Sequence, residues 1–170
     1  VSQQFLDEIE LCVPALRRYA RALTRNADRA DDLVQDCLER AIRKQALWKR
    51  PGPLKAWLFR ILLNLYRNEL RVVRRRGEHL AVEALVAEPA VAPAQPGRIA
   101  LAEMARAIET LAAEQREALL LVVLEGMSYA EAATALGIPI GTLMSRLGRA
   151  RAALRTATGG AEEPRLRTVK

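Results

Sequence analysis

Residues 128–154, SYAEAATALGIPIGTLMSRLGRARAAL, contain the signals for two short helices separated by a tight turn. Ser128 and Glu131 have the spacing of a capping box, which starts a helix, and Gly137 supplies a C-terminal stop. Pro139 suits the first turn of a second helix, where its missing N–H is not needed. This stretch therefore predicts a helix-turn-helix and restricts this end of the chain to helical packing.

The second helix of this motif has two different faces. Its apolar stripe consists of Ile140, Leu143, Leu147, Ala150 and Leu154. Its other face is polar and basic and carries Thr142, Ser145, Arg146, Arg149, Arg151 and Arg155. Small polar side chains can approach base edges in a major groove, and arginines can bind guanine or phosphate. This face suits DNA binding, and for the motif taken alone a solvated basic face on an ordinary helical hairpin is an equal alternative.

The whole chain is predicted to be all-α, with two small helical domains joined by a flexible linker. Hydrophobic residues make up 51% and aromatic residues 4% of the sequence, so the cores must consist largely of Leu, Ala, Val and Ile, and strand signals are absent. Residues 77–97 are rich in Ala, Val, Glu and Pro and contain no Lys or Arg, which is typical of a linker. The predicted divisions are a first domain at 1–76, this linker, a second domain at 98–155 and a mobile tail at 156–170.

The charge of the chain indicates a polyanionic partner. The formal net charge is +7 and the arginines are clustered, which favours nucleic acid. A membrane-surface helix would need Trp or Phe opposite the charges, and neither Arg-rich segment has this. Cys12, Cys37 and His79 lack metal-site spacing, so we expect no metal, no cofactor and no catalytic Cys/His pair. Neither a signal peptide nor a transmembrane segment is predicted, so a cytoplasmic protein without membrane insertion is expected.

The first domain is predicted to begin with two helices. Residues 11–24 have an apolar stripe, and Asn26 or Asp28 can cap a following helix. The buried side of that helix is predicted to be Val34, Cys37, Leu38, Ala41 and Ile42. Its outer side carries Asp32, Gln35, Asp36 and Glu39. From the pattern alone a solvated face is the simpler interpretation of these polar groups, and a protein-docking face is the more specific one.

The longest predicted helix starts at Leu54, after a loop at 45–53. Its core stripe is Leu54, Trp57, Leu58, Ile61, Leu62 and Leu65. Its second half is basic, with Arg67, Arg71, Arg74, Arg75 and Arg76. Trp57, Asn64 and Asn68 lie on or beside this helix, and aromatic and amide groups next to a basic surface suit unstacked bases. Trp57 is also expected to be at least partly a core residue.

The second domain is predicted to contain two more helices before the helix-turn-helix. The first has the apolar positions Leu101, Met104, Ala105, Ile108 and Leu111. The second has Leu119, Leu120, Val122 and Val123, and it ends at Glu125-Gly126.

Three motifs in this order resemble the extracytoplasmic-function sigma factors of bacterial RNA polymerase. DDLVQDCLERA is similar to the core-polymerase-binding helix of that family, and AWLFRILLNLYRNELR is similar to its promoter-melting helix. EQREALLLVVLEGMSYAEAATALGIPIGTLMSRLGRARAAL is similar to its C-terminal promoter-binding domain. The resemblance extends from about Leu11 to Leu154.

The resemblance implies a function and a set of binding residues. The first domain would correspond to sigma region 2 and the second to region 4. The polymerase-binding residues would be Asp32, Gln35, Asp36 and Glu39. The −10 residues would be Trp57, Asn64, Arg67, Asn68 and Arg71, with the 45–53 loop helping to hold a flipped base. The −35 residues would be Thr142, Met144, Ser145, Arg146, Gly148 and Arg149. The implied partners are core RNA polymerase, promoter DNA and an anti-sigma factor.

Three other functions are weighed against this one. A free-standing helix-turn-helix regulator would bind DNA without polymerase, and it leaves the long basic helix unexplained. An enzyme would need a convergent catalytic cluster or a phosphate loop, and the sequence shows neither. A sigma-like decoy would only sequester an anti-sigma protein.

Overall fold

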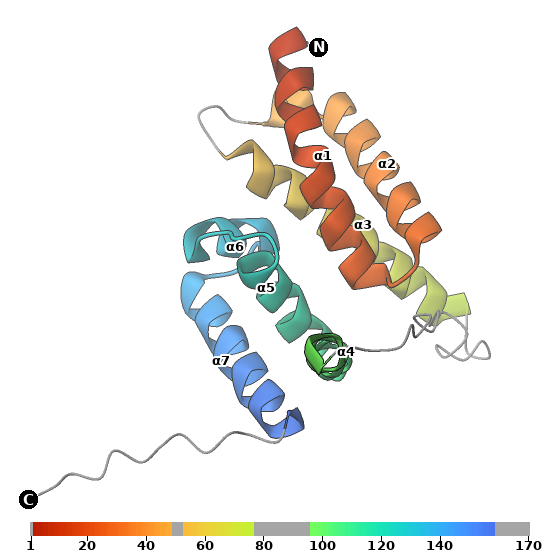
Figure 1. The fold of residues 1–170 in the computed structure, drawn as a ribbon. Coiled ribbons are helices and arrows are strands. Elements are labelled where there is room, and N and C mark those ends of the chain that lie inside the picture. The colour runs from red at the N-terminus through yellow and green to blue at the C-terminus, as the bar shows by residue number, and fades with distance from the viewer. Residues whose placement is uncertain (1, 49–52, 77–95, 159–170) are drawn as a thin grey trace, which may run out of the picture.

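The computed structural model describes residues 2–48, 53–76 and 96–158, and every regular element in these ranges is a helix. The helices are α1 (Gln3–Thr24), α2 (Ala27–Arg43), the 3-10 helix η1 (Gln45–Leu47), α3 (Leu54–Arg76), α4 (Pro96–Glu109), α5 (Ala113–Val123), α6 (Tyr129–Leu136) and α7 (Ile140–Ala157) (Figure 1). None of these helices is long and apolar enough to span a bilayer. The all-α prediction in two helical parts is confirmed. Most of the predicted linker, and the tail beyond Thr158, lie outside the described residues.

Helix α1 starts eight residues earlier than the sequence pattern predicts. The hydroxyl of Ser2 accepts a hydrogen bond from the backbone N–H of Phe5, which caps the helix at Gln3. Phe5 and Ile9 are buried and extend the apolar stripe toward the N-terminus. The prediction of a start at Leu11 was wrong because the Ser2 cap and the buried Phe5 and Ile9 add two further turns before residue 11.

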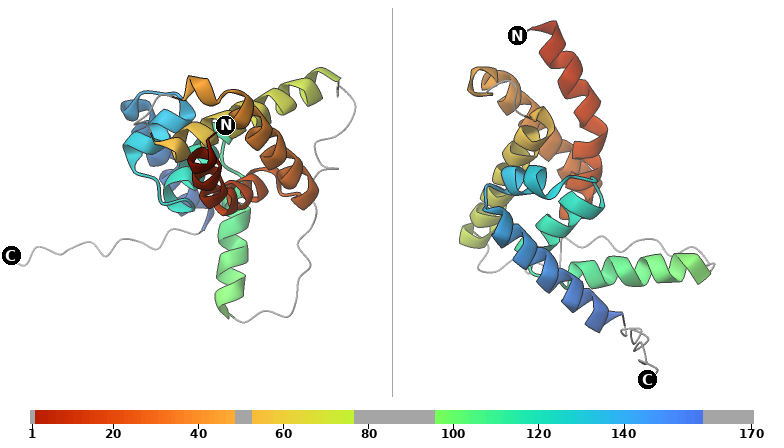
Figure 2. Two further views of the ribbon diagram at one scale, coloured as in Figure 1. Left: turned by 90° about the horizontal axis from the view of Figure 1, so that it is seen from above. Right: turned by 90° about the vertical axis from the view of Figure 1, so that its left-hand side faces the viewer.

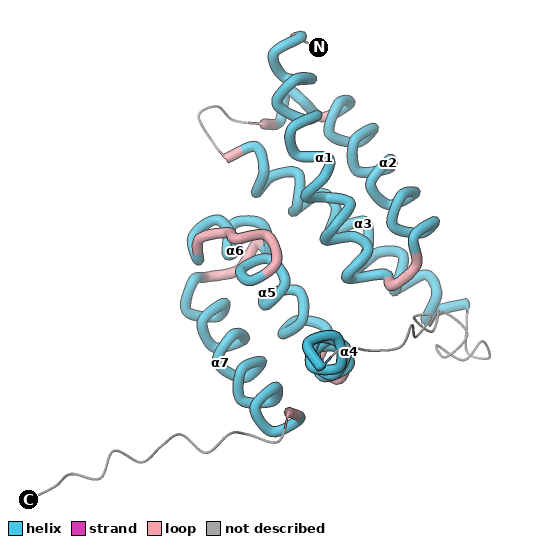
Figure 3. The backbone as a smooth tube through the Cα atoms, viewed as in Figure 1, coloured by secondary structure: helices cyan, strands magenta, loops and turns pink. Residues whose placement is uncertain are grey.

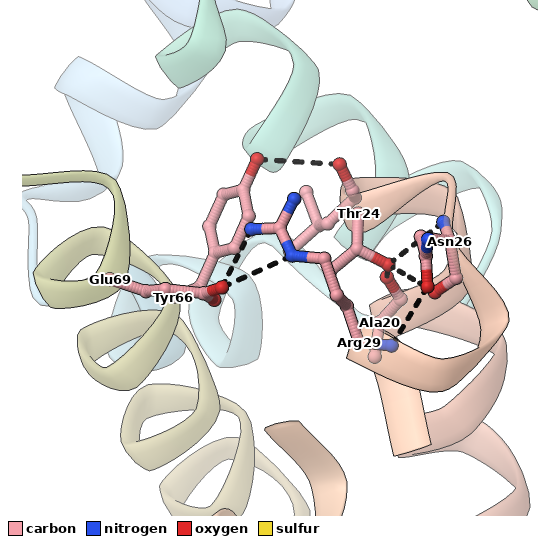
Figure 4. Close-up of polar contacts among 7 residues, drawn as sticks. Ala20, Thr24, Asn26, Arg29, Tyr66 and Glu69 are labelled. Carbon is pink, nitrogen blue, oxygen red and sulfur yellow. Dashed lines mark hydrogen bonds and ion pairs between the residues drawn. The ribbon is translucent and has the colours of Figure 1, made fainter. Parts of the chain in front are cut away.

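Helices α1, α2 and α3 form the N-terminal half, in which α1 packs on α2, and both pack on α3. Asn26 is the cap of α2, because its side-chain oxygen accepts from the N–H of Arg29 at 2.9 Å. Figure 4 shows the polar contacts that fix this turn against α3: Arg29 donates to Glu69, and Tyr66 donates to the carbonyl of Leu23. The three helices therefore form a bundle in which hydrogen bonds fix the turn between α1 and α2 on α3.

Most of the residues predicted to form the buried sides of α2 and α3 are buried in the structure. Cys37 is fully buried and its thiol donates to the carbonyl of Leu58, while burial raises the pKa of this thiol to about 12. Ile42, predicted to be buried, is exposed because it lies in the last turn of α2. Trp57 and Leu65 are half-buried at the edge of the α3 stripe, which agrees with the partial core role expected for Trp57.

Helices α6 and α7 form the predicted helix-turn-helix. Ser128 and Glu131 make both hydrogen bonds of a capping box, and the carboxylate of Glu131 accepts from the Ser128 hydroxyl and N–H, which lowers the pKa of Glu131. Gly137 closes α6 with φ of 67°, a conformation that disfavours a side chain. Pro139 is the N-cap of α7, one position before the helix that it was predicted to open.

The predicted apolar stripe of α4 is buried only at its C-terminal end. Leu101 and Met104 are exposed, and burial begins only toward the end of the helix, at Ala107 and then at Leu111. Figure 2 shows the reason: α4 extends away from the remaining helices, with only its C-terminal end near α5 and α7. The helix itself was predicted correctly, and its apolar stripe packs on the core only at Ile108 and Leu111.

The two halves of the chain pack against each other. Helix α3 lies against α6, and α1 lies against α5, so that the buried side chains of both halves form one continuous core. The tube in Figure 3 shows α6 beside α3 and α5 beside the end of α1, with α7 on the far side of α5 and α6. The sequence made no prediction of this arrangement.

Candidate nucleic-acid interface

Helix α7 presents a polar row away from its core stripe. Leu143, Leu147 and Ala150 are buried, and this holds the helix rigidly against α5 and α6. The exposed side carries Thr142, Met144, Ser145, Gly148 and Arg149. Small side chains allow close approach of a ligand backbone, and a Cβ added at Gly148 would meet no atom within 4 Å. This is the face that the sequence predicted to read DNA.

Arg146 differs from the other predicted residues of α7. Its guanidinium lies 3.1 Å from the carboxylate of Glu114 on α5, and its side chain is only 15% exposed. The pair helps to fix α7 on α5 within the C-terminal half. A DNA contact from Arg146 would have to share the guanidinium with Glu114.

Three of the predicted −10 residues lie on the exposed side of α3. Asn64, Asn68 and Arg71 are all exposed, and Arg71 donates to the side-chain oxygen of Asn68 at 3.3 Å. Trp57 is half-buried, so part of its ring is accessible. This side of α3 thus carries two amides, one guanidinium and a half-buried aromatic residue.

Arg67, the fifth predicted −10 residue, is held by the other half of the protein. It donates to both carboxylate oxygens of Glu117 on α5, at 3.3 Å and 2.5 Å. This hydrogen bonding raises the pKa of Arg67, and the Glu117 side chain is only 4% exposed. The hydroxyl of Tyr19 also donates to the backbone carbonyl of Glu117.

A second buried carboxylate repeats this arrangement. Arg18 on α1 donates to both oxygens of Glu125, whose side chain is fully buried. The ammonium of Lys55 donates to the backbone carbonyl of Glu125 at 3.0 Å. A third pair joins Arg25 to Glu109 at 2.9 Å. In each pair the N-terminal half supplies the cation and the C-terminal half supplies the carboxylate.

A groove runs between α3, the start of α5 and α7. Its lining combines residues of both predicted DNA surfaces with the acids that bind them: Arg67, Arg71, Arg74, Glu114, Glu117 and Arg146. The predicted −10 helix and the predicted −35 helix therefore contribute to the walls of one groove.

The predicted polymerase-binding residues share the exposed side of α2. Asp32, Gln35, Asp36 and Glu39 are all exposed. Glu39 accepts weak hydrogen bonds from Gln35 and Arg43 at 3.3 Å and 3.4 Å. Two shallow hollows between α2 and α3 reach this surface, and Asp36 and Leu65 contribute to both. The surface is acidic at its start and basic at its end.

Sequence reasoning missed Glu117 and Glu125. Both stand at the borders of the apolar run 118–124, where an acid at a core position was a usable signal for a buried ion pair. Among the residues with described positions, no group of three His, Cys, Asp or Glu side chains could hold a metal ion.

Two family models match the chain, one in each half. Residues 9–63 match the model described as the Sigma2 domain of PhyR, and residues 101–154 match Sigma-70, region 4. A relative named ECF RNA polymerase sigma factor EcfG, from Rhodopseudomonas palustris, is 42% identical over 148 residues, which cover 87% of this chain and 81% of the relative. SigM from Mycobacterium tuberculosis is 33% identical, covering 85% of this chain and 71% of the relative.

Solved structures agree with these matches. The sigma factor RpoE, solved with the anti-sigma factor NepR from Bartonella quintana, superposes with a TM-score of 0.77 at 38% identity and covers 93% of this chain and 98% of its own. CnrH, solved with the cytosolic domain of CnrY, has a TM-score of 0.64 at 28% identity, covering 92% and 86%. With both halves matched in order and close relatives covered over most of their length, the chain belongs to the extracytoplasmic-function sigma factors of bacterial RNA polymerase.

Proposed function

We propose that this protein binds core RNA polymerase and directs it to promoters, reading the −35 element with α7 and helping to open the −10 element with α3. The observation that carries the proposal is the exposed row on α7, built on a rigid helix-turn-helix in a chain that belongs to the sigma family. The work is binding and positioning, without covalent chemistry or a cofactor. The domain boundaries proposed are 1–76 for the −10 part and 98–155 for the −35 part.

The −35 contacts proposed are Thr142, Met144, Ser145, Gly148 and Arg149, with Arg146 as a secondary contact. Thr142, Ser145 and Arg149 follow each other at helical spacing, so they can face the same groove. Arg149 is exposed and long enough to take a guanine edge or a phosphate.

The −10 contacts proposed are Trp57, Asn64, Arg67, Asn68 and Arg71. Single-stranded DNA is bound by combining cations that track the backbone with groups that stack on or hydrogen-bond to bases. The exposed amides of Asn64 and Asn68 and the accessible part of the Trp57 ring supply the second kind. Arg67 and Arg71 supply the first.

The polymerase contacts proposed are Asp32, Gln35, Asp36 and Glu39. Their exposure on one side of α2, opposite the buried Val34, Cys37 and Ala41, leaves them available to a partner. Charged groups at the edge of such a contact mainly set the rate and the specificity of association.

An anti-sigma factor is the third proposed partner. The solved relatives RpoE and CnrH were captured with NepR and with the cytosolic domain of CnrY. A protein that binds across both halves would hold them together and away from polymerase. The cytoplasm, where polymerase acts, is the proposed location.

Run-off transcription tests the function. Purified core polymerase and this protein would be incubated with a promoter library, and enriched transcripts would be sequenced. Transcripts that require both the protein and a shared upstream motif are expected. Transcription by core polymerase that does not change when the protein is added would contradict the proposal. Tight, sequence-specific DNA binding by the protein alone would also contradict it and would support a free-standing regulator.

A decoy function is a second candidate, because the model matched by the N-terminal half is described as a domain of PhyR. A decoy would bind an anti-sigma factor and would not need a DNA-reading face. The same transcription assay separates the two, since a decoy yields no promoter-dependent transcript with core polymerase.

A further inference from the structure

The row proposed to read DNA on α7 has an arginine at each edge. Arg146 and Arg151 are separated by five positions, which places them about 140° apart around an α-helix. The proposed −35 contacts Ser145 and Gly148 lie in the arc between them. Each arginine contacts a side chain of a neighbouring helix, Arg146 one on α5 and Arg151 one on α6.

The partner of Arg146 is a carboxylate, whereas the partner of Arg151 is a neutral hydroxyl. Glu114 lies 3.1 Å from the guanidinium of Arg146 and neutralises its charge. The guanidinium of Arg151 donates to the hydroxyl of Tyr129, also over 3.1 Å. In the described part of the chain no carboxylate lies within ion-pair distance of Arg151. Arg151 is therefore held in place while its charge stays available to an anion.

The ring of Tyr129 gives this contact a fixed base. The ring is partly buried and packs against the core, while its hydrogen bond to Arg151 lies at the surface. An arginine that is held before binding loses less conformational entropy when it makes a contact, because its rotamers are already restricted. The acid nearest to Tyr129 in the sequence, Glu131, instead accepts hydrogen bonds from the N–H and hydroxyl of Ser128.

The position of this pair in the helix-turn-helix matches a DNA backbone. In this motif the second helix lies in the major groove and the first helix crosses the backbone. Tyr129 is the first residue of α6, which is the first helix of the motif, and its contact with Arg151 joins α6 to α7. The edge of α7 that faces α6 therefore lies beside a phosphate strand when the central row enters the groove. A guanidinium has the geometry to donate to phosphate oxygens.

We propose that Tyr129 is a positioning residue for promoter binding, which orients Arg151 toward one backbone phosphate at the edge of the −35 element. This inference rests on the proposed function, because it takes α7 to enter the major groove at that element. The two edges of α7 then have different tasks: Arg146 fixes the helix on α5, and Arg151 fixes its register on the DNA. Phosphate contacts carry no sequence information directly, so the pair sets affinity and register without choosing a base.

Filter binding of the holoenzyme at several salt concentrations tests the pair, with the duplex promoter enriched in the run-off experiment as the probe. Tyr129→Phe removes only the hydroxyl, and we expect the affinity to fall about two- to tenfold, the range for one hydrogen bond. Arg151→Ala should also lower the slope of log affinity against log salt by about one. In the Arg151→Ala background, Tyr129→Phe should cause no further loss. An equal loss in both backgrounds would overturn the proposal.

A matched control separates this role from a purely structural one. Tyr66→Phe removes the same atom from a buried tyrosine of α3, whose hydroxyl donates to the carbonyl of Leu23. We expect Tyr66→Phe to lower the melting temperature and to leave the salt slope unchanged. Tyr129→Phe should weaken DNA binding with the melting temperature close to that of wild type. Weaker binding by Tyr129→Phe that merely follows a lower melting temperature would count against the proposal.

A second measurement keeps Tyr129 intact. The phosphates around the −35 element are replaced one at a time by neutral methylphosphonates, and each duplex is bound to wild-type and Arg151→Ala holoenzyme. Wild type should lose affinity at one position where Arg151→Ala loses none. If every position affects the two proteins equally, Arg151 contacts no phosphate and the proposal fails, even if Tyr129→Phe does not fold.

Run-off transcription by the wild-type protein separates failure of the inference from failure of the proposed function. If wild type supports no promoter-dependent transcription, the proposed function fails and the inference fails with it. If wild type is active and the variants bind the promoter as wild type does, only the inference fails.

Discussion

The guanidinium of Arg18 donates to both carboxylate oxygens of Glu125, over 3.0 Å and 2.6 Å, and joins α1 to the turn after α5. The carboxylate is fully buried while the arginine remains half exposed. The contact spans 107 positions of sequence, so it is a tertiary contact that neither half can make alone.

The first prediction concerns the stability of this pair. Arg18→Ala leaves a buried carboxylate without its cation, and we expect the melting temperature to fall by about 2–4 °C or more. Calorimetry would measure the shift. Arg17→Ala is the matched control, because Arg17 pairs with Asp31 at 3.7 Å and both are exposed, a kind of pair that contributes little. Equal shifts for the two variants would show that the buried pair does not stabilise the fold.

The second prediction compares two arginines of α7. Arg149→Ala should cost about 1–3 kcal/mol in −35 binding with relaxed preference at one base if Arg149 reads a guanine, and should reduce the salt slope if it binds phosphate. Arg146→Ala should cost less, because Glu114 already occupies that guanidinium. Filter binding of holoenzyme at several salt concentrations measures both. No effect of Arg149→Ala on affinity or salt slope would exclude this face from the groove.

The third prediction assigns base capture to Asn64. Removing one hydrogen bond to an extruded base should slow promoter opening about two- to tenfold, with little change in promoter docking. Asn64→Ala would be compared with wild type on a closed duplex and on a template with a pre-melted −10 bubble. The defect should disappear on the bubble. A defect that instead follows a lower melting temperature would assign Asn64 a structural role.

The fourth prediction concerns polymerase binding by α2. Asp32→Asn with Asp36→Asn should weaken binding to core polymerase about three- to tenfold and make it less sensitive to salt. Surface plasmon resonance measures the rates. Glu10→Gln with Asp28→Asn removes the same charge from other exposed positions and should leave binding unchanged. If both double variants lose affinity equally, only net charge matters.

The fifth prediction concerns pH and the capping box of α6. Hydrogen bonds from Ser128 lower the pKa of Glu131 below its ordinary value of 4.5. This stabilisation is fully present above pH 4.5 and is lost as pH falls through the lower folded-state pKa. Ser128→Ala should cost about 1 kcal/mol at pH 7 and less in acid, as followed by denaturant melts at each pH. A cost that is the same at pH 7 and pH 3 would contradict this linkage.

The parts of the fold that local chemistry determines could be predicted from the sequence. The capping box at Ser128, the stop at Gly137 and the stripe from Leu143 to Ala150 depend on residues within a few positions of each other. The start of α3 at Leu54 was likewise marked by nearby prolines and glycine. Such signals can be recognised in the sequence because all the residues that make up each one belong to a single helix or its ends.

The packing of the halves could not be predicted, because it depends on pairs far apart in the chain. No residue near Arg67 in the sequence indicates that its partner is Glu117. From the sequence, the basic second half of α3 is expected to be entirely exposed to solvent. The exposure of Leu101 and Met104 has the same origin, since α4 meets its neighbours only at one end. Amphipathic spacing shows which face could be buried, and tertiary contacts decide whether it is.

The order of the Arg67–Glu117 pair along the chain has a consequence during synthesis. The cation precedes its carboxylate by 50 residues. A ribosome that adds about 5–20 residues per second needs roughly 2.5–10 s to make that interval. During each round of translation Arg67 is therefore made before the carboxylate that pairs with it, and for that interval its guanidinium is open to other anions, the phosphates of ribosomal RNA among them.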